Sequence, residues 1–137
     1  MKPARATMDA TAELVERRVE MNGWSVYIIK DRWLRLERAP RARKWTKREL
    51  RAFKSLIAAG YEIEGGIGLG YRDDYEYARG CGPTEEVRQI WIYGLHFDTD
   101  VVEVMTKLGY HLRKFNPGYS GWPRGSMAEF IKETRLR

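Results

Sequence analysis

The hydrophobic and polar positions of residues 46–59 form the clearest pattern in the chain, and they predict an amphipathic helix. Thr46 followed by Glu49 is a capping box, in which each side chain accepts a hydrogen bond from the other residue's backbone amide. Trp45 before the cap and Leu50 after it have the spacing of a hydrophobic staple. Gly60 supplies the left-handed position at which such a helix ends.

Three further helices are predicted from signals of the same kind. Residues 9–21 have apolar side chains at helical spacing, and the Asn22-Gly23 pair that follows is typical of a helix end. A short helix is predicted over residues 98–109, which begin with Asp-Thr-Asp and end in glycine. A last helix is predicted over residues 127–136, because Ser and Glu at positions 126 and 129 repeat the capping-box spacing.

Runs of β-branched and aromatic residues, or of alternating polar and apolar residues, predict the strands. These strands lie at residues 24–31, 32–39, 61–73, 88–97 and 109–115. The first two are expected to form a hairpin around residues 30–32, and the glycines of the third indicate that another group comes close to its backbone. Together the elements indicate an α+β fold with a mostly antiparallel sheet and helices packed on it. We expect a single domain over residues 1–137, with residues 116–125 as a turn-rich connector to the C-terminal helix.

Composition limits the classes of protein to consider. The chain has 137 residues, of which 43% are hydrophobic and 32% charged, and this balance is typical of one folded domain. No apolar run approaches the ~20 residues that a membrane-spanning helix needs, and the N-terminal residues have no apolar signal segment. The one cysteine, Cys81, excludes a framework of internal disulfides. We therefore expect a cytoplasmic protein that does not bind membranes.

The charges are segregated along the chain, although the net charge is only +6. Residues 30–54 hold eleven basic and three acidic side chains, a net charge of +8. Residues 55–103 hold three basic and ten acidic side chains, a net charge of −7. Such asymmetry bears on partners and association rates rather than on the fold.

The predicted helix at 46–59 divides this basic segment into two faces. On a helical wheel, its apolar side chains fall on one arc and its basic side chains on another, so the basic arc is expected to face solvent. One interpretation is a solvated helix face. The other is an anion-binding surface, because like charges repel at i,i+3 and i,i+4 and cations in a first turn oppose the helix dipole. An anionic partner would offset both costs. The candidate binding residues are Arg41, Arg43, Lys44, Lys47, Arg48, Arg51 and Lys54.

Charge alone leaves three classes of partner open: nucleic acid, an acidic protein surface and a phosphate-bearing small molecule. Residues 55–103 argue against a nucleic acid that wraps around the protein, because their negative charge would repel phosphate on one side. The favoured interpretation is a non-catalytic binding protein, regulatory or inhibitory, with no cofactor. In the loop before the C-terminal helix, Tyr119 and Trp122 are candidate aromatic contacts to bases or to a protein. The C-terminal helix would offer Met127, Phe130 and Ile131 as a docking stripe for a second copy.

No residue set predicts catalysis or metal binding strongly. The GGIGLG run at residues 65–70 lacks the Lys-Ser/Thr of a phosphate loop and is better explained as a strand. His96 lies near two aspartates, at positions 98 and 100, that could bind a metal, but a helix begins there and the aspartates fit as caps. Cys81 with His96 or His111 is a lone thiol with two unplaced histidines. We expect no metal and no catalytic residue.

Two segments resemble the GNAT acyltransferase superfamily. Residues 98–115, DTDVVEVMTKLGYHLRKF, are similar to its late strand–helix–strand unit, with Leu108-Gly109-Tyr110 at the end of the helix. Met105 stands where the family has a reactive-side tyrosine, and an aspartate stands at the position of the helix-starting asparagine.

Residues 41–61 resemble the segment of the same superfamily that binds the pantetheine pyrophosphate. Arg41 and Gly60-Tyr61 fit the pattern, whereas Lys44 and Thr46 replace its two glycines. The resemblance implies a GNAT-like fold and, as the alternative function, an N-acyltransferase that uses acetyl-CoA. The departures imply a degenerate relative that has lost acetyl-CoA binding and the tyrosine's general-acid role.

Overall fold

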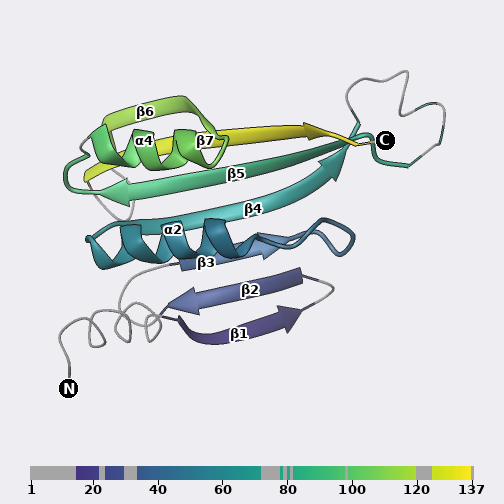
Figure 1. The fold of residues 1–137 in the computed structure, drawn as a ribbon, viewed down its shortest axis with the longest axis horizontal. Coiled ribbons are helices and arrows are strands. Elements are labelled where there is room, and N and C mark those ends of the chain that lie inside the picture. The colour runs from purple at the N-terminus through teal and green to yellow at the C-terminus, as the bar shows by residue number, and fades with distance from the viewer. Residues whose placement is uncertain are drawn as a thin grey trace.

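The computed structural model describes residues 15–21, 24–29, 34–71, 82–97, 99–119 and 125–136, together with residues 78 and 80. Within this part of the chain, a seven-stranded sheet has the order β1-β2-β3-β4-β5-β7-β6, and two helices pack on it (Figure 1). The helices are α2 (Lys47–Ala58) and α4 (Thr99–Lys107). The strands are β1 (Val15–Met21), β2 (Trp24–Ile29), β3 (Leu34–Arg38), β4 (Glu62–Gly70), β5 (Glu85–Gly94), β6 (His111–Tyr119) and β7 (Gly125–Arg135).

The sheet is mixed but mostly antiparallel, as the sequence predicts for an α+β fold. Only β3 and β4 pair in parallel among these strands, from Leu34 opposite Ile63 to Arg38 opposite Ile67. Parallel neighbours need a crossover connection, and α2 provides it. The antiparallel pairing predicted for the strands at 24–31 and 32–39 is confirmed, because β2 and β3 are antiparallel neighbours, and the predicted turn at residues 30–32 lies outside the described residues.

Both helices cover the same face of the sheet. One cluster of buried side chains contains Phe53 and Leu56 of α2, Val101 and Met105 of α4, and alternate residues of the central strands. Those strand residues share a face by register: they are Leu36, Ile63, Ile67, Ile90, Ile92 and Phe130. Gly65 lies among them because a Cβ there would come within 2.5 Å of the Ile90 Cδ1. The core is therefore a single layer between sheet and helices.

The helix α2 begins and ends as predicted. Thr46 is its N-cap, the Thr46 Oγ1 accepts a hydrogen bond from the Glu49 amide at 3.0 Å, and the Thr46 amide donates to the Glu49 Oε1 at 2.9 Å. Gly60 follows with a φ of 112°, a conformation that suits glycine. The helix α4 was also predicted. No helix within the described residues is long and apolar enough to cross a membrane.

The predicted N-terminal helix is wrong over residues 15–21, which form β1, and residues 9–14 lie outside the described part. β1 pairs with β2, and Met21 stands opposite Trp24. The Asn22-Gly23 pair between them is the sequence most typical of a tight hairpin, and we interpreted it as a helix end. Apolar residues at 15, 19 and 21 alternate with polar residues at 16, 18 and 20, apart from Arg17 in the apolar phase, and this near-alternation fits a strand.

The predicted C-terminal helix is also wrong, because residues 125–135 form β7. This strand lies between β5 and β6 and pairs with both. Met127, Phe130 and Ile131 are 8%, 0% and 4% exposed, so they cannot serve as an exposed docking stripe for a second copy. Pairing on both edges and burial of both faces outweigh the local helix signal. The turn-rich connector predicted at 116–125 is corrected in part, since residues 116–119 belong to β6 and residues 120–124 are not described.

Candidate binding surface

The predicted basic residues lie along α2 and in the loop before it. Arg41, Lys44, Lys47, Arg48 and Arg51 are exposed, and Lys54 is half-buried. Among the described residues, none of these six side chains forms an ion pair with a carboxylate. We call these six residues the basic surface. The division of α2 into an apolar and a basic face is thus present in the structure.

Arg43, the seventh predicted residue, differs from the others because its charge is compensated. Its Nη2 lies 2.8 Å from the Glu86 Oε1, and its Nε and backbone amide donate to the Glu86 Oε2 at 3.2 and 3.3 Å. The pKa of Arg43 is raised by the hydrogen bonds that it donates to Glu86 and by the negative charge of Glu86. Arg43 therefore belongs to the internal structure of the loop rather than to the free cations around it.

Glu86 is a completely buried carboxylate on β5. Burial by itself would raise its pKa, but hydrogen bonds from Arg43 and Arg88 outweigh this effect and hold the pKa below its ordinary value. The two arginines thus keep Glu86 ionised inside the protein.

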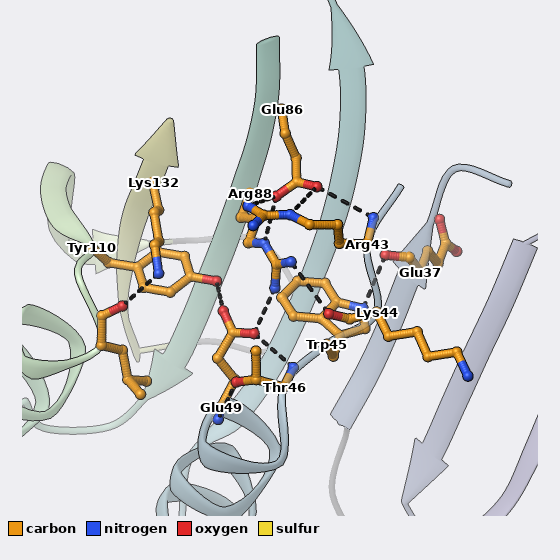
Figure 2. A network of polar contacts seen from close by, with 11 residues as sticks. Glu37, Arg43, Lys44, Trp45, Thr46, Glu49, Glu86, Arg88, Tyr110 and Lys132 are labelled. Atoms are coloured by element: carbon orange, nitrogen blue, oxygen red, sulfur yellow. Dashed lines mark hydrogen bonds and ion pairs between the residues drawn. The ribbon is translucent and has the colours of Figure 1, made fainter. Parts of the chain in front are cut away.

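Arg88, two residues further along β5, lies at the centre of this group (Figure 2). Its Nη1 lies 2.5 Å from the Glu49 Oε1, its Nε donates to the Glu86 Oε1 at 3.1 Å, and its Nη2 donates to the Lys44 carbonyl at 3.2 Å. The guanidinium carbon also lies 5.4 Å from the centre of the Trp45 ring. Arg88 therefore connects β5 to the first turn of α2 and to the loop before it.

Tyr110 completes the network from the other side of Glu49. Its hydroxyl donates to the Glu49 Oε2 at 2.7 Å. Burial, followed by the charge of Glu49, raises the pKa of Tyr110 well above its ordinary value, so the hydroxyl remains a donor. Lys132 lies over the Tyr110 ring at 5.8 Å and donates to the Leu108 carbonyl at 3.0 Å.

The network is balanced in charge and fully hydrogen-bonded. Two arginines, Arg43 and Arg88, face two glutamates, Glu49 and Glu86, and no buried polar side-chain atom of the described residues lacks a partner. A closed set of this kind is suited to holding backbone segments in place rather than to acid–base chemistry. It fixes the start of α2, and with it the direction in which the basic surface points.

Sequence analysis missed this network, although one signal was present. Glu86 and Arg88 occupy the same phase of β5 as Ile90 and Ile92, so the alternation of that strand already points both charges into the core. Two charged residues on the apolar side of a strand indicate a buried ion pair. The net charge of residues 55–103 includes both residues but does not show that they face the core.

A groove separates the basic surface from α4. It has a volume of about 360 Å³ and is lined by Arg48, Arg51, Ala52, Ser55, Leu56, Val104, Lys107 and Leu108. Arg48 crosses one end of it, where its Nη2 donates to the Lys107 carbonyl at 2.9 Å. Cations at the last carbonyls of a helix are favourable, so this bond also stabilises the end of α4.

The remaining candidates do not come together. His96 and His111 are exposed, Cys81 and Asp98 lie outside the described residues, and no group of three metal-ligating side chains occurs within that part of the chain. Of the aromatic candidates, Trp122 and the side chain of Tyr119 also lie outside it.

Two of the residues that depart from the GNAT pattern, Met105 and Thr46, have internal roles here. Met105 is fully buried, and the Thr46 and Glu49 amides are bound within the capping box rather than free for an anion. The chain was compared with protein-family models, with curated proteins and with solved structures, and none of the three comparisons found a match.

Proposed function

We propose that the protein is a non-catalytic binding protein that captures an anionic macromolecule through the basic surface. The observation that carries this proposal is the contrast between neighbouring cations. Arg43 and Arg88 are matched by the buried carboxylates of Glu86 and Glu49, whereas the six residues of the basic surface have no carboxylate partner within the described residues. A nucleic acid or an acidic protein surface would supply the missing charge.

The cost of keeping these cations together supports a role for them. Lys47, Arg51 and Lys54 stand at i,i+4 and i,i+3, where like charges destabilise a helix by about 0.2–0.5 kcal/mol per pair. The network around Arg88 holds the first turn rigidly, so the surface is organised before a partner arrives. Preorganisation lowers the entropy lost on binding.

The direction of approach is also defined. The opposite face of the sheet carries Glu37, Glu64 and Glu129, which alternate with the core residues of β3, β4 and β7. Arg35 and Arg113 lie 3.6 and 3.9 Å from Glu64 and Glu129 and partly neutralise these two carboxylates, whereas the basic surface has no carboxylate partner within the described residues. The partner would therefore approach from the helix side.

Charge reversal tests the proposal. The double variant Lys47→Glu/Arg51→Glu should weaken binding of a labelled oligothymidylate and of a labelled polyglutamate peptide by at least about tenfold at low salt, because it removes two attractive contacts and adds two repulsive ones. The measurement is fluorescence anisotropy at two salt concentrations, together with a thermal melt.

The matched control is Arg113→Glu/Lys114→Glu on β6, which changes the net charge equally at exposed positions away from α2. It should retain most of the binding. Equal losses in both double variants would mean that only net charge matters, and the proposal would be wrong.

The alternative function is an N-acyltransferase that uses acetyl-CoA. One feature favours it: α2 connects two parallel strands, so its first turn lies beside the end of β3, where the GNAT resemblance expects the pyrophosphate. Calorimetry with acetyl-CoA tests it, and an absence of heat at millimolar ligand would remove this alternative.

A further inference from the structure

We propose that the partner is a protein, and that it inserts an apolar side chain from an acidic helical segment into the groove between α2 and α4. This inference rests on the proposed function, because it assigns the partner class of the same surface. It commits to one occupant, a helix with carboxylates flanking an apolar anchor.

The lining of the groove is the first argument. Leu56 and Leu108 are buried and Ala52 and Val104 are half-buried, so the floor is aliphatic. A volume of about 360 Å³ holds one or two side chains rather than a large cofactor. Burying a leucine side chain on this floor would strengthen binding by about tenfold or more beyond the contribution of charge.

The charges around the floor are the second argument. Arg48 and Arg51 lie on the α2 side and Lys107 on the α4 side, and all three are exposed. Lys107 also pairs with Glu103 at 3.2 Å, but both of those side chains are more than 60% exposed. An apolar floor between cations on both sides is complementary to an apolar residue between carboxylates.

The shape of the groove favours a helix over a nucleic acid. The lining extends over two turns of α2, from Arg48 to Ser55, which matches apolar residues at i and i+4 of a docked helix. No aromatic side chain of the described residues lines the groove, so it offers no platform on which bases could stack.

Three labelled probes test the proposal: a 16-residue helical peptide with Glu on its flanks and Leu at i and i+4, the same peptide with Gln for Leu, and a 20-nucleotide oligothymidylate. The wild-type protein should bind the leucine peptide about tenfold or more tightly than the glutamine peptide. Ser55→Trp fills the groove without changing charge. It should abolish this preference and leave affinity for the glutamine peptide unchanged.

Ala58→Trp is the matched control, because Ala58 is exposed on α2 but does not line the groove. It should retain the preference for leucine. Equal binding of the two peptides by the wild-type protein, or a preference that survives Ser55→Trp, would overturn the groove as an anchor site. Oligothymidylate bound more tightly than the leucine peptide would assign the surface to nucleic acid.

The experiments distinguish failure of the groove assignment from failure of the proposed function. If the glutamine peptide binds and Lys47→Glu/Arg51→Glu abolishes this binding, the basic surface is functional even when leucine adds nothing, and only the groove assignment is wrong. If none of the probes binds the wild-type protein at low salt, the proposed function is wrong and the groove assignment falls with it.

Discussion

Arg88 holds together parts of the chain that lie far apart in sequence. Its buried guanidinium binds the carboxylates of Glu49 and Glu86. It also lies over the face of the Trp45 ring and donates a hydrogen bond to the Lys44 carbonyl. Removing this cation would leave the buried Glu49 carboxylate without an ion-pair partner among the described residues, and would leave Glu86 with Arg43 alone. Buried ion pairs are weak evidence for net stability, but breaking one by removing a single partner is costly.

Arg88→Met should therefore lower the free energy of unfolding by about 3–5 kcal/mol, as for other buried pairs that lose one partner. Arg35→Met is the comparison, because Arg35 and Glu64 form an exposed pair at 3.6 Å, and exposed pairs contribute about 0–1 kcal/mol. Urea denaturation of both variants measures the difference. Similar losses in the two would show that the network around Arg88 is not important for stability.

At the scale of elements, α2 is defined by local signals, whereas β1 and β7 are not. The capping box of Thr46 and Glu49 lies within four residues, so the same bonds form wherever the helix is placed. β1 and β7 carry short-range signals for helix but become strands, since their neighbours provide hydrogen-bonding edges. Local preference decides an element only where tertiary partners do not compete with it.

Thr46→Ala should lower the free energy of unfolding by about 1 kcal/mol, because it removes the side-chain acceptor for the Glu49 amide. Thr106→Ala in α4 is a suitable control: Thr106 is exposed and within a helix, where surface substitutions change stability by about 0.5 kcal/mol or less. Chemical denaturation, followed by the helical circular dichroism signal, measures the free energy of unfolding of both variants. A loss for Thr46→Ala no larger than that of the control would argue against the cap.

At the scale of the whole molecule, charge is sorted by face as well as by sequence. The helix side of the sheet carries the basic surface, and the opposite face of the sheet carries carboxylates. Between these two faces, the arginines and glutamates of the buried network neutralise one another. The stability of the whole molecule therefore depends on keeping the buried Glu86 carboxylate ionised.

Stability should fall as the pH falls through the acid range. The pKa of Glu86 is lower in the folded protein than its ordinary value of 4.5, so at low pH the unfolded chain takes up a proton before the folded protein does. The contribution of Glu86 is present in full above pH 4.5 and is lost as the pH falls through its depressed folded pKa.

Urea denaturation between pH 7 and pH 3 should show this decrease in the unfolding free energy. In Glu86→Gln the dependence on pH should be shallower and the stability at pH 7 lower, because the amide cannot titrate and Arg43 and Arg88 lose a charged partner. An unchanged slope in the variant would contradict the assignment of the shift to Glu86.

Several parts of this protein could be predicted from sequence because they depend on residues close together in the chain. These parts are the α+β class, the antiparallel pairing of β2 and β3, both ends of α2, and the separation of its apolar and basic faces. Periodicity and caps are local properties, and the sequence contains them completely. The sequence predicted which cations form the candidate surface. It did not show that Arg43 is paired with a carboxylate while the other six have no such partner within the described residues.

Tertiary structure decided the rest, because it depends on partners distant in the chain. Arg43 is matched by Glu86, 43 residues away, and Tyr110 reaches Glu49 across 61 residues. The strand at 125–135 forms because two other strands offer it their edges, and the groove exists because α2 and α4 pack side by side on one sheet face. Such contacts follow from how the whole chain packs, and no local pattern of residues specifies them.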